Sequence, residues 1–249
     1  FRYTRQWEEM TRRIGFWVNL NEAYVTYHQS YVESVWWALK TLFEKGLLYQ
    51  GHKVVWWWAQ GGTALSSGEV GEGYRDTDDP SVFIRFKVKD AGKVPGGNAN
   101  LPTSLVAWTT TPWTLSSNMA LAVREDFTYA LVEHRDAEVV ERFVLAQDLI
   151  EKTFAGLPID VKKDLRVVST FPGSALLGLA YEPVLRYLDP EEGRVWEVDS
   201  ADFVTLDQGT GIVHIAPAFG EDDYRFAKEK GFGFLQMVKP DGTFRAEQT

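Results

Sequence analysis

The spacing of apolar residues changes along this chain from a helical to a strand-like repeat, and that change limits the fold more than any other feature. Over residues 32–43 apolar side chains recur every three or four positions, which places them in one stripe along a helix. Over residues 82–88 a period of two takes over, as in a strand with one mainly apolar face. Short apolar runs separated by turn-forming residues continue to residue 216. The pattern predicts an α+β, mainly β fold.

The same change divides the chain into three parts. We expect a helical segment over 1–50, a β-ribbon connector over 51–80 and a small β-barrel domain with decorating helices over 81–249. The chain begins without Met and ends in a turn that leads towards another strand. Both features indicate a piece of a longer protein.

Capping residues mark the expected helix boundaries. Ser30 and Glu33 match a capping box at the start of the clearest amphipathic helix, and Gly46 ends it. Residues 136–154 are expected to form another helix, because their later apolar residues fall on one side. Residues 221–230 have acids in the first turn and lysines in the last, as a further helix would. Short strands are expected at residues 54–58, 82–88, 105–110, 119–123, 128–133, 165–170, 195–198, 203–206 and 211–216.

Composition and charge exclude several classes of protein. The 249 residues contain no cysteine, which excludes disulfides, thiolate metal sites and a cysteine nucleophile. No apolar run approaches the roughly 18 residues that a membrane-spanning helix needs, and no signal peptide is recognisable. We therefore expect a cytoplasmic protein without a membrane partner. The formal net charge of −9 argues against a broad nucleic-acid surface but allows a pocket for one end of a nucleic acid.

A run of three threonines in segment 108–118 is the first candidate for chemistry. In a strand, Thr109 and Thr111 face one way and Thr110 the other, and Pro112 then breaks the alternation. Several hydroxyls can therefore converge on one pocket, where they suit a water, a carbonyl or a ribose. The alternative is an edge strand that is rich in β-branched residues, and composition alone favours it.

Segment 209–224 is the second candidate. His214 shares a strand face with apolar neighbours, and a histidine in that position is more often a core residue than a catalyst. Asp223 lies in the first turn of a predicted helix, where a carboxylate is stabilising without any substrate. It could instead anchor a cation such as the amino group of an amino acid. Spacing alone does not say which of Glu221, Asp222 and Asp223 points inward.

Other potential sites are weaker. His28, His52 and His134 are scattered and lack partners at metal-ligand spacing, so we expect no metal. The chain has no nucleophile elbow and no phosphate-binding loop. The Trp56–Trp58 run could stack a base, although such residues more often cover a small core.

The two segments together resemble the signature segments of the editing domain of isoleucyl-tRNA synthetases, which is a large insertion in the class I catalytic fold. Pro112 and Trp113 favour the isoleucyl branch, because the valyl and leucyl editing domains usually carry an Arg-Pro pair after the threonines. Segments 15–20 and 33–40 look like the helical part that leads into this insertion. The resemblance covers nearly the whole chain.

This resemblance implies hydrolytic editing of mischarged valyl-tRNA(Ile). A methylene gives a binding pocket only about 1–3 kcal/mol, a limit known from this family's own discrimination between isoleucine and valine, so a second sieve is needed. The implied partners are the 3′ end of tRNA(Ile) carrying valine and the remainder of the synthetase. By the resemblance, the catalytic and substrate-binding residues are Thr109, Thr110 and Thr111 around the ester, Trp113 in the wall, Asn118 in the same signature, Asp223 on the α-amino group and His214 against the side chain.

Two departures from relatives narrow the expectation. Many relatives carry a Cys-x-x-Cys metal knuckle where this chain has Trp58 and Gly61, so we expect tryptophan packing in place of zinc. Neither adenylation motif of the class I fold occurs, so the chain should need no cofactor; ATP and Mg belong to the absent catalytic domain. The alternatives are an editing domain of a related valyl or leucyl type and a β-barrel that binds tRNA ends without hydrolysis.

Overall fold

The computed structural model describes residues 2–136, 139–155 and 157–245. The chain divides into two compact units, residues 1–52 and 53–249. The first unit contains helix α1 (Arg2–Arg13), a 3₁₀ turn η1 (Leu20–Glu22) and helix α2 (Gln29–Glu44). None of its described residues is buried, so its apolar stripes find no core within this unit. Helix α2 begins before Ser30, and its cap residue is His28, so the capping box predicted at Ser30 is wrong.

The second unit begins with a two-stranded ribbon, β1 (Trp57–Trp58) and β2 (Thr63–Ala64), followed by helix α3 (Ser67–Glu72). The Trp57 indole nitrogen donates a hydrogen bond of 2.6 Å to the carbonyl of Pro240, which holds the ribbon against a distant loop. The ring of Trp58 lies over Gly61, where a Cβ atom would collide with it. Trp58 and Gly61 are the two positions at which tryptophan packing was expected in place of a metal.

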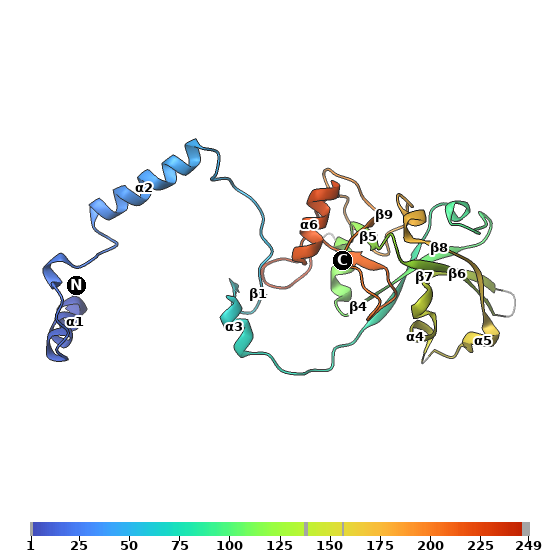
Figure 1. Cartoon of the computed structure of the whole chain (residues 1–249), viewed down its shortest axis with the longest axis horizontal. Coiled ribbons are helices and arrows are strands. Elements are labelled where there is room, and N and C mark those ends of the chain that lie inside the picture. Colours follow the sequence, from blue (N-terminus) through green and yellow to red (C-terminus); the bar gives the residue numbers. More distant parts are fainter. Residues whose placement is uncertain (1, 137–138, 156, 246–249) are drawn as a thin grey trace. The chain divides into compact units, whose positions relative to one another are not determined.

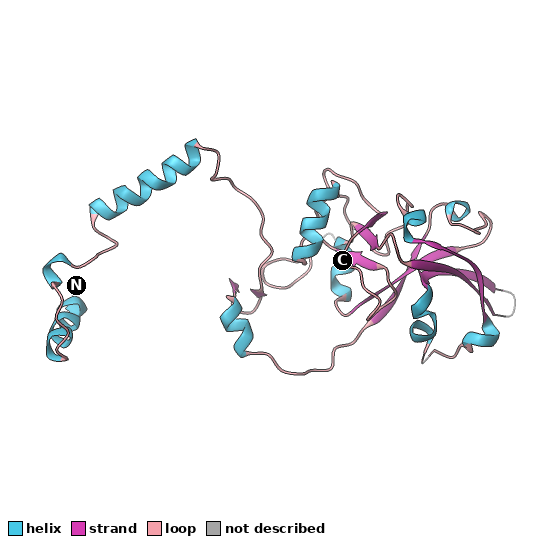
Figure 2. Ribbon diagram, viewed as in Figure 1, coloured by secondary structure: helices cyan, strands magenta, loops and turns pink. Residues whose placement is uncertain are grey.

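Strands dominate the rest of the second unit (Figure 2). A five-stranded sheet has the order β3-β4-β7-β6-β8, in which only the β4–β7 pair is parallel. A three-stranded sheet has the order β10-β5-β9, in which β5 and β9 are parallel. The strands are β3 (Val82–Lys87), β4 (Thr103–Thr109), β5 (Ala120–Val123), β6 (Thr128–Asp136), β7 (Val139–Ala146), β8 (Leu165–Pro172), β9 (Glu197–Ser200) and β10 (Val213–Ile215).

Short helices cover the edges and faces of these sheets (Figure 1). Helix α4 packs its apolar residues against β6 and β7, and helix α6 packs Phe226 and Ala227 against β5 and β10. Gly231, in the left-handed conformation, ends α6 as the sequence predicts. The helical elements of this unit after α3 are α4 (Ile150–Phe154), α5 (Val161–Asp164), α6 (Glu221–Lys230) and the 3₁₀ turns η2 (Ala91–Lys93), η3 (Pro112–Ser117), η4 (Gln147–Leu149) and η5 (Gly173–Leu176).

A segment without regular structure joins the two larger sheets. Tyr181 bridges to Val88 just beyond β3, and Ala180 bridges to Glu197 in β9. The amide of Tyr181 also donates to the carbonyl of Trp196 at 3.0 Å. The position of Tyr181 is therefore set by backbone hydrogen bonds on both sides.

Two sequence-based expectations of secondary structure are wrong. Residues 139–146 of the predicted helix over 136–154 form strand β7, and α4 covers only the last five residues of that range. Phe143 and Leu145 enter one apolar cluster while Val144 and Ala146 enter another, so both faces of β7 are buried and its apolar run imitates a helical stripe. Residues 203–206, expected as a strand, form none.

The expected fold class is confirmed, since the second unit is mainly β with decorating helices. The described strands do not close into a barrel, because β3 and β8 are the free edges of the larger sheet. Among the described residues, no helix combines the length and the apolar character required to cross a membrane.

Candidate active site

The threonine run lies where β4 ends and the chain turns into η3. Thr109 is half-buried, and its hydroxyl accepts a hydrogen bond of 3.1 Å from the amide of Thr111. The two hydroxyls lie 3.2 Å apart. Thr110 and Thr111 are exposed. The expected convergence of hydroxyls therefore occurs for Thr109 and Thr111.

The second half of the same segment is buried and hydrogen-bonded. The Thr114 hydroxyl donates 2.8 Å to the carbonyl of Thr111 and lies 3.0 Å from Nε2 of His214. Nδ1 of His214 lies 2.8 Å from the amide nitrogen of Asn118, and Oδ1 of Asn118 accepts from the hydroxyl of Tyr181 at 2.8 Å. The resemblance implied site roles for Asn118 and His214, and the structure brings these two side chains into direct contact.

Burial governs the charge of His214. The side chain is only 8% exposed, and desolvation lowers its pKa to about 4. The ring is therefore neutral at pH 7. It stacks against Phe86 with ring centroids 6.5 Å apart. Since both ring nitrogens already have partners, His214 contributes shape and hydrogen bonds, and it has no free nitrogen with which to remove a proton.

The acids at the start of α6 differ in their surroundings. Oδ2 of Asp223 accepts 2.9 Å from the amide of Ala216, and burial raises the pKa of this carboxyl to about 6. Asp222 is exposed and pairs with Arg225 at 3.3 Å. Asp223 is therefore the acid whose side chain turns back towards Ala216, at the end of strand β10. A Cβ atom at Gly220 would lie 2.9 Å from Cγ of Asp223, so the carboxylate folds over this glycine.

Besides the Asn118–His214 hydrogen bond, two further side-chain contacts join the segments. Trp113 lies edge-to-face on Phe219 with centroids 4.9 Å apart, and His214 contacts Thr114 as described above. Trp113 stays 45% exposed, whereas Asn118 is buried. Strands β5 and β10 also pair directly, with Leu121 opposite His214. The two segments thus lie together, with exposed hydroxyls and a partly exposed aromatic ring in the first segment beside buried polar side chains.

Sequence reasoning did not single out three residues of this region. Thr114 lies within the first signature segment, but no local pattern shows that its hydroxyl is buried against His214. Gly220 precedes the acids, but nothing in the sequence shows that a carboxylate covers it. Tyr181 lies 63 residues beyond Asn118, and no local pattern connects them.

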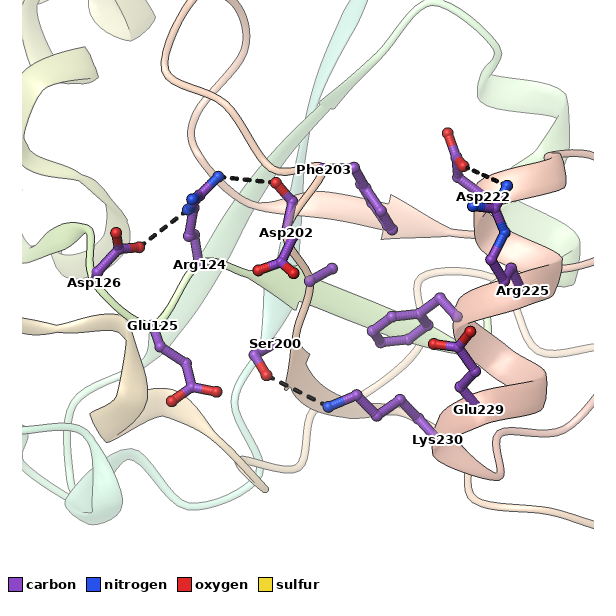
Figure 3. Close-up of a pocket in the computed structure, with 12 residues that line it drawn as sticks. Arg124, Glu125, Asp126, Ser200, Asp202, Phe203, Asp222, Arg225, Glu229 and Lys230 are labelled. Atoms are coloured by element: carbon purple, nitrogen blue, oxygen red, sulfur yellow. Dashed lines mark hydrogen bonds and ion pairs between the residues drawn. The ribbon is translucent and has the colours of Figure 1, made fainter.

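A separate cavity of about 680 Å³ lies on another side of α6 (Figure 3). Asp222 and Arg225 line it from the helix, and Arg124 faces them, held 3.0 Å from Asp126. None of the predicted site residues lines this cavity. Its walls carry charges of both signs, and in the part of the chain that the structure describes no three His, Asp or Glu side chains gather as metal ligands.

The chain matches, over residues 1–229, the family described as tRNA synthetases class I (I, L, M and V). It is 43% identical over 244 residues to the isoleucine–tRNA ligase of Clostridium tetani, covering 98% of this chain and 22% of that protein. The isoleucine–tRNA ligase of Thermus thermophilus is 42% identical over 247 residues, with 99% and 22% covered. The chain spans about a fifth of the length of these relatives.

A solved structure shares the fold. The editing domain of the cytosolic leucyl-tRNA synthetase of P. falciparum superposes with a TM-score of 0.50 at 11% sequence identity, covering 62% of this chain and 69% of that chain. The resemblance to isoleucyl-tRNA synthetases that the two segments indicated is therefore confirmed. The chain belongs to the family of class I tRNA synthetases for isoleucine, leucine, methionine and valine.

Proposed function

We propose that this chain hydrolyses the ester bond of valine attached to tRNA(Ile), as an editing domain. The observation that carries the proposal is the meeting of two segments about a hundred residues apart through the His214–Thr114 contact of 3.0 Å. One segment supplies the paired hydroxyls of Thr109 and Thr111, and the other supplies the half-buried carboxylate of Asp223. The fold of editing domains and the isoleucine–tRNA ligase relatives support the same reading.

The groups of this region match the parts of an aminoacyl ester. Above pH 6 the ionised Asp223 can accept a charge-assisted hydrogen bond from the α-ammonium group. The hydroxyls of Thr109 and Thr111 can hold a water and donate to the oxyanion that develops on the ester carbonyl. Thr110 is exposed beside them, available to the terminal adenosine.

No strong general base is required from this chain. The ester is already activated, so positioning a water beside it supplies much of the rate. His214 has a pKa of about 4 and both nitrogens engaged, which argues against it as the base. We assign the proton of the attacking water to a ribose hydroxyl of the substrate. As the water oxygen bonds to the ester carbon and the ester C–O bond breaks, this hydroxyl passes a proton on to the leaving ribose oxygen, giving free valine and tRNA.

Selection of valine over isoleucine is assigned to packed walls. In this proposal His214 occupies the volume that the extra methylene of isoleucine would need, with the partly exposed Trp113 as a further wall. The side-chain amide of Asn118 holds the imidazole in place through its contact with Nδ1. Overfilling a packed wall costs roughly 1–3 kcal/mol, which suffices for a second sieve.

The test is deacylation of valyl-tRNA(Ile), isoleucyl-tRNA(Ile) and threonyl-tRNA(Val) by the folded chain at low salt and high protein concentration. We expect valyl-tRNA(Ile) to be hydrolysed well above the rate without protein, while isoleucyl-tRNA(Ile) persists. A full-length isoleucine–tRNA ligase is the positive control. Preferred hydrolysis of threonyl-tRNA(Val) would assign the domain to a valyl-type reaction, and tRNA binding without any hydrolysis would assign a binding module instead.

A further inference from the structure

Four buried side chains form one directed chain of hydrogen bonds beneath the proposed site. Tyr181 is fully buried, and Asn118, Thr114 and His214 are at most 8% exposed. The chain runs from the Tyr181 hydroxyl through Asn118, His214 and Thr114 to the carbonyl of Thr111. Each link is between 2.8 and 3.0 Å long. Three of these residues lie in the two signature segments, whereas Tyr181 lies in the segment that joins the sheets.

The direction of every link follows from its two ends. A carbonyl only accepts, so the carbonyl of Ala120, 2.9 Å from the Asn118 amide nitrogen, must face the NH₂ group. The Asn118 oxygen then points to Tyr181, whose hydroxyl donates to it. The remaining amide proton of Asn118 points to Nδ1 of His214, so Nδ1 carries the lone pair.

The directions of the hydrogen bonds at Thr114, the other end of this network, depend on that assignment. With Nδ1 as acceptor, the single proton of the neutral ring resides on Nε2 and is donated to the oxygen of Thr114. The Thr114 hydroxyl proton is then free to bond the carbonyl of Thr111. In the opposite tautomer Nε2 would need a donor, and Thr114 would give up its bond to Thr111. The tautomer therefore influences the turn that brings the hydroxyls of Thr109 and Thr111 together.

We propose that Tyr181 is a positioning residue of this site, which together with the Ala120 carbonyl fixes the Asn118 side-chain amide and thereby selects the His214 tautomer that donates from Nε2 to Thr114. Among the described residues, its hydroxyl is the one side-chain donor to Oδ1 of Asn118. Without it that buried oxygen loses its partner, and the Ala120 carbonyl alone opposes a flipped amide. The flipped amide, which favours a proton on Nδ1, then competes more strongly. The role in selectivity rests on the proposed editing function, whereas the role in the tautomer does not.

The test is Tyr181→Phe in the whole chain, which removes one oxygen and keeps the ring. Tyr129→Phe is the control, because Tyr129 is also fully buried and its hydroxyl lies outside this hydrogen-bond network. That hydroxyl donates 2.6 Å to the carbonyl of Gly211 and accepts 3.1 Å from the amide of Arg124. The two nitrogens of each imidazole are followed by nitrogen-15 NMR in protein labelled at histidine. The chain has four histidines, and a His214→Gln sample identifies the signals of interest.

We expect a single Nε2–H tautomer for His214 in the unaltered protein and in Tyr129→Phe. In Tyr181→Phe the two nitrogen frequencies should move towards each other as the second tautomer becomes populated. The ratio of valyl-tRNA to isoleucyl-tRNA hydrolysis should fall about fivefold in the same variant, the effect of losing roughly one hydrogen bond. Tyr129→Phe removes two hydrogen bonds, so its melting temperature should fall at least as far as that of Tyr181→Phe, and stability alone cannot produce the difference.

The outcomes separate the proposal from the proposed function. An unchanged His214 tautomer in Tyr181→Phe overturns the proposal whatever the rates show. A changed tautomer with an unchanged hydrolysis ratio overturns the positioning role in selectivity. If the unaltered chain hydrolyses none of the tRNAs, the editing function fails, and the NMR comparison still decides whether Tyr181 sets the tautomer.

Discussion

The two halves of segment 109–118 lie side by side in the chain but in opposite environments. Residues 109–113 are exposed or half-buried, and the Thr109 and Thr111 hydroxyls keep capacity for further hydrogen bonds. Residues 114–118 are buried, and Thr114 and Asn118 use their polar atoms on protein partners. The outer half can therefore meet a substrate directly, whereas the inner half can act only through shape and position.

Helix α6 repeats this contrast in two adjacent residues. Asp222 is exposed, pairs with Arg225 and lines the cavity on its own side of the helix. Asp223 is half-buried beside Ala216, and desolvation raises its pKa to about 6. An acid whose charge is costly and partly unsatisfied is the better candidate for binding an ammonium group. Substitutions at both kinds of residue test this contrast between groups that meet substrate and groups that position them.

The largest effect is expected for Asp223→Asn, which keeps an acceptor for the Ala216 amide but removes the charge. Losing a charge-assisted bond to the ammonium costs about 1.5–3 kcal/mol, so valyl-tRNA hydrolysis should fall roughly 10- to 100-fold. The melting temperature at pH 7 should be maintained or rise, because a desolvated charge is gone. Initial deacylation rates and a melting curve measure both. Asp222→Asn is the matched control, and an equal loss of activity there would contradict the assignment.

The next effect concerns His214→Ala, which tests whether buried bulk sets selectivity. The variant opens the wall, so isoleucyl-tRNA should become a substrate while valyl-tRNA is still hydrolysed, with the rate ratio changing by roughly 10-fold. It also removes one hydrogen-bond partner each from the buried side chains of Asn118 and Thr114, so a lower melting temperature is expected. Rates for both tRNAs are compared below the melting transition. Loss of valyl-tRNA hydrolysis with no new substrate would indicate a general base and refute the steric role.

An intermediate effect should appear when pH is lowered. The pKa of Asp223 is about 6, so at pH 5 only about a tenth of the carboxyl groups remain ionised. Affinity for an amide-linked valyl-adenosine, measured by calorimetry, should therefore fall about tenfold between pH 7 and pH 5. His214, with a pKa of about 4, stays neutral over most of this range. Asp223→Asn should bind weakly and independently of pH; an unaltered protein with constant affinity would rule out the ionised anchor.

The same two groups should change the free energy of unfolding in opposite directions as the pH changes. The folded pKa of Asp223 lies above its unfolded value of 3.8, so its burial cost grows as pH rises from about 4 to 6. The folded pKa of His214 lies below its unfolded value of 6.5, so its contribution is lost as pH falls from about 6.5 to 4.

The smallest effect is expected for Gly220→Ala. Its φ of −125° suits alanine, so the backbone is not strained, but the new methyl group would lie 2.9 Å from Cγ of Asp223. The carboxylate must move by a fraction of its own size, and valyl-tRNA hydrolysis should fall a few-fold, about 1 kcal/mol. Gly71→Ala serves as control, because nothing lies within 4 Å of that position. Equal rates of hydrolysis for both variants would show that the activity tolerates a small shift of the Asp223 carboxylate.

Local patterns were informative where one face of an element meets one environment. The alternation at Val82–Lys87 and the charge pattern of Glu221–Lys230 predicted β3 and α6 correctly. The two chemistry-bearing segments were found from residue types and order, and the structure joins them. Strand β7 was mistaken for a helix because both of its faces are buried, so its apolar residues carry no alternation.

The sequence by itself determined the mainly β character of the second unit, the two segments and their polar residue types, because these follow from local spacing. Only the tertiary structure decided that Asp223 rather than Asp222 turns inward, that His214 is neutral, and that Tyr181 reaches Asn118. Those properties depend on burial and on contacts between residues far apart in the chain. Water exclusion sets the pKa values, and pairing of distant strands sets the hydrogen bonds, so neither is written in any short stretch of sequence.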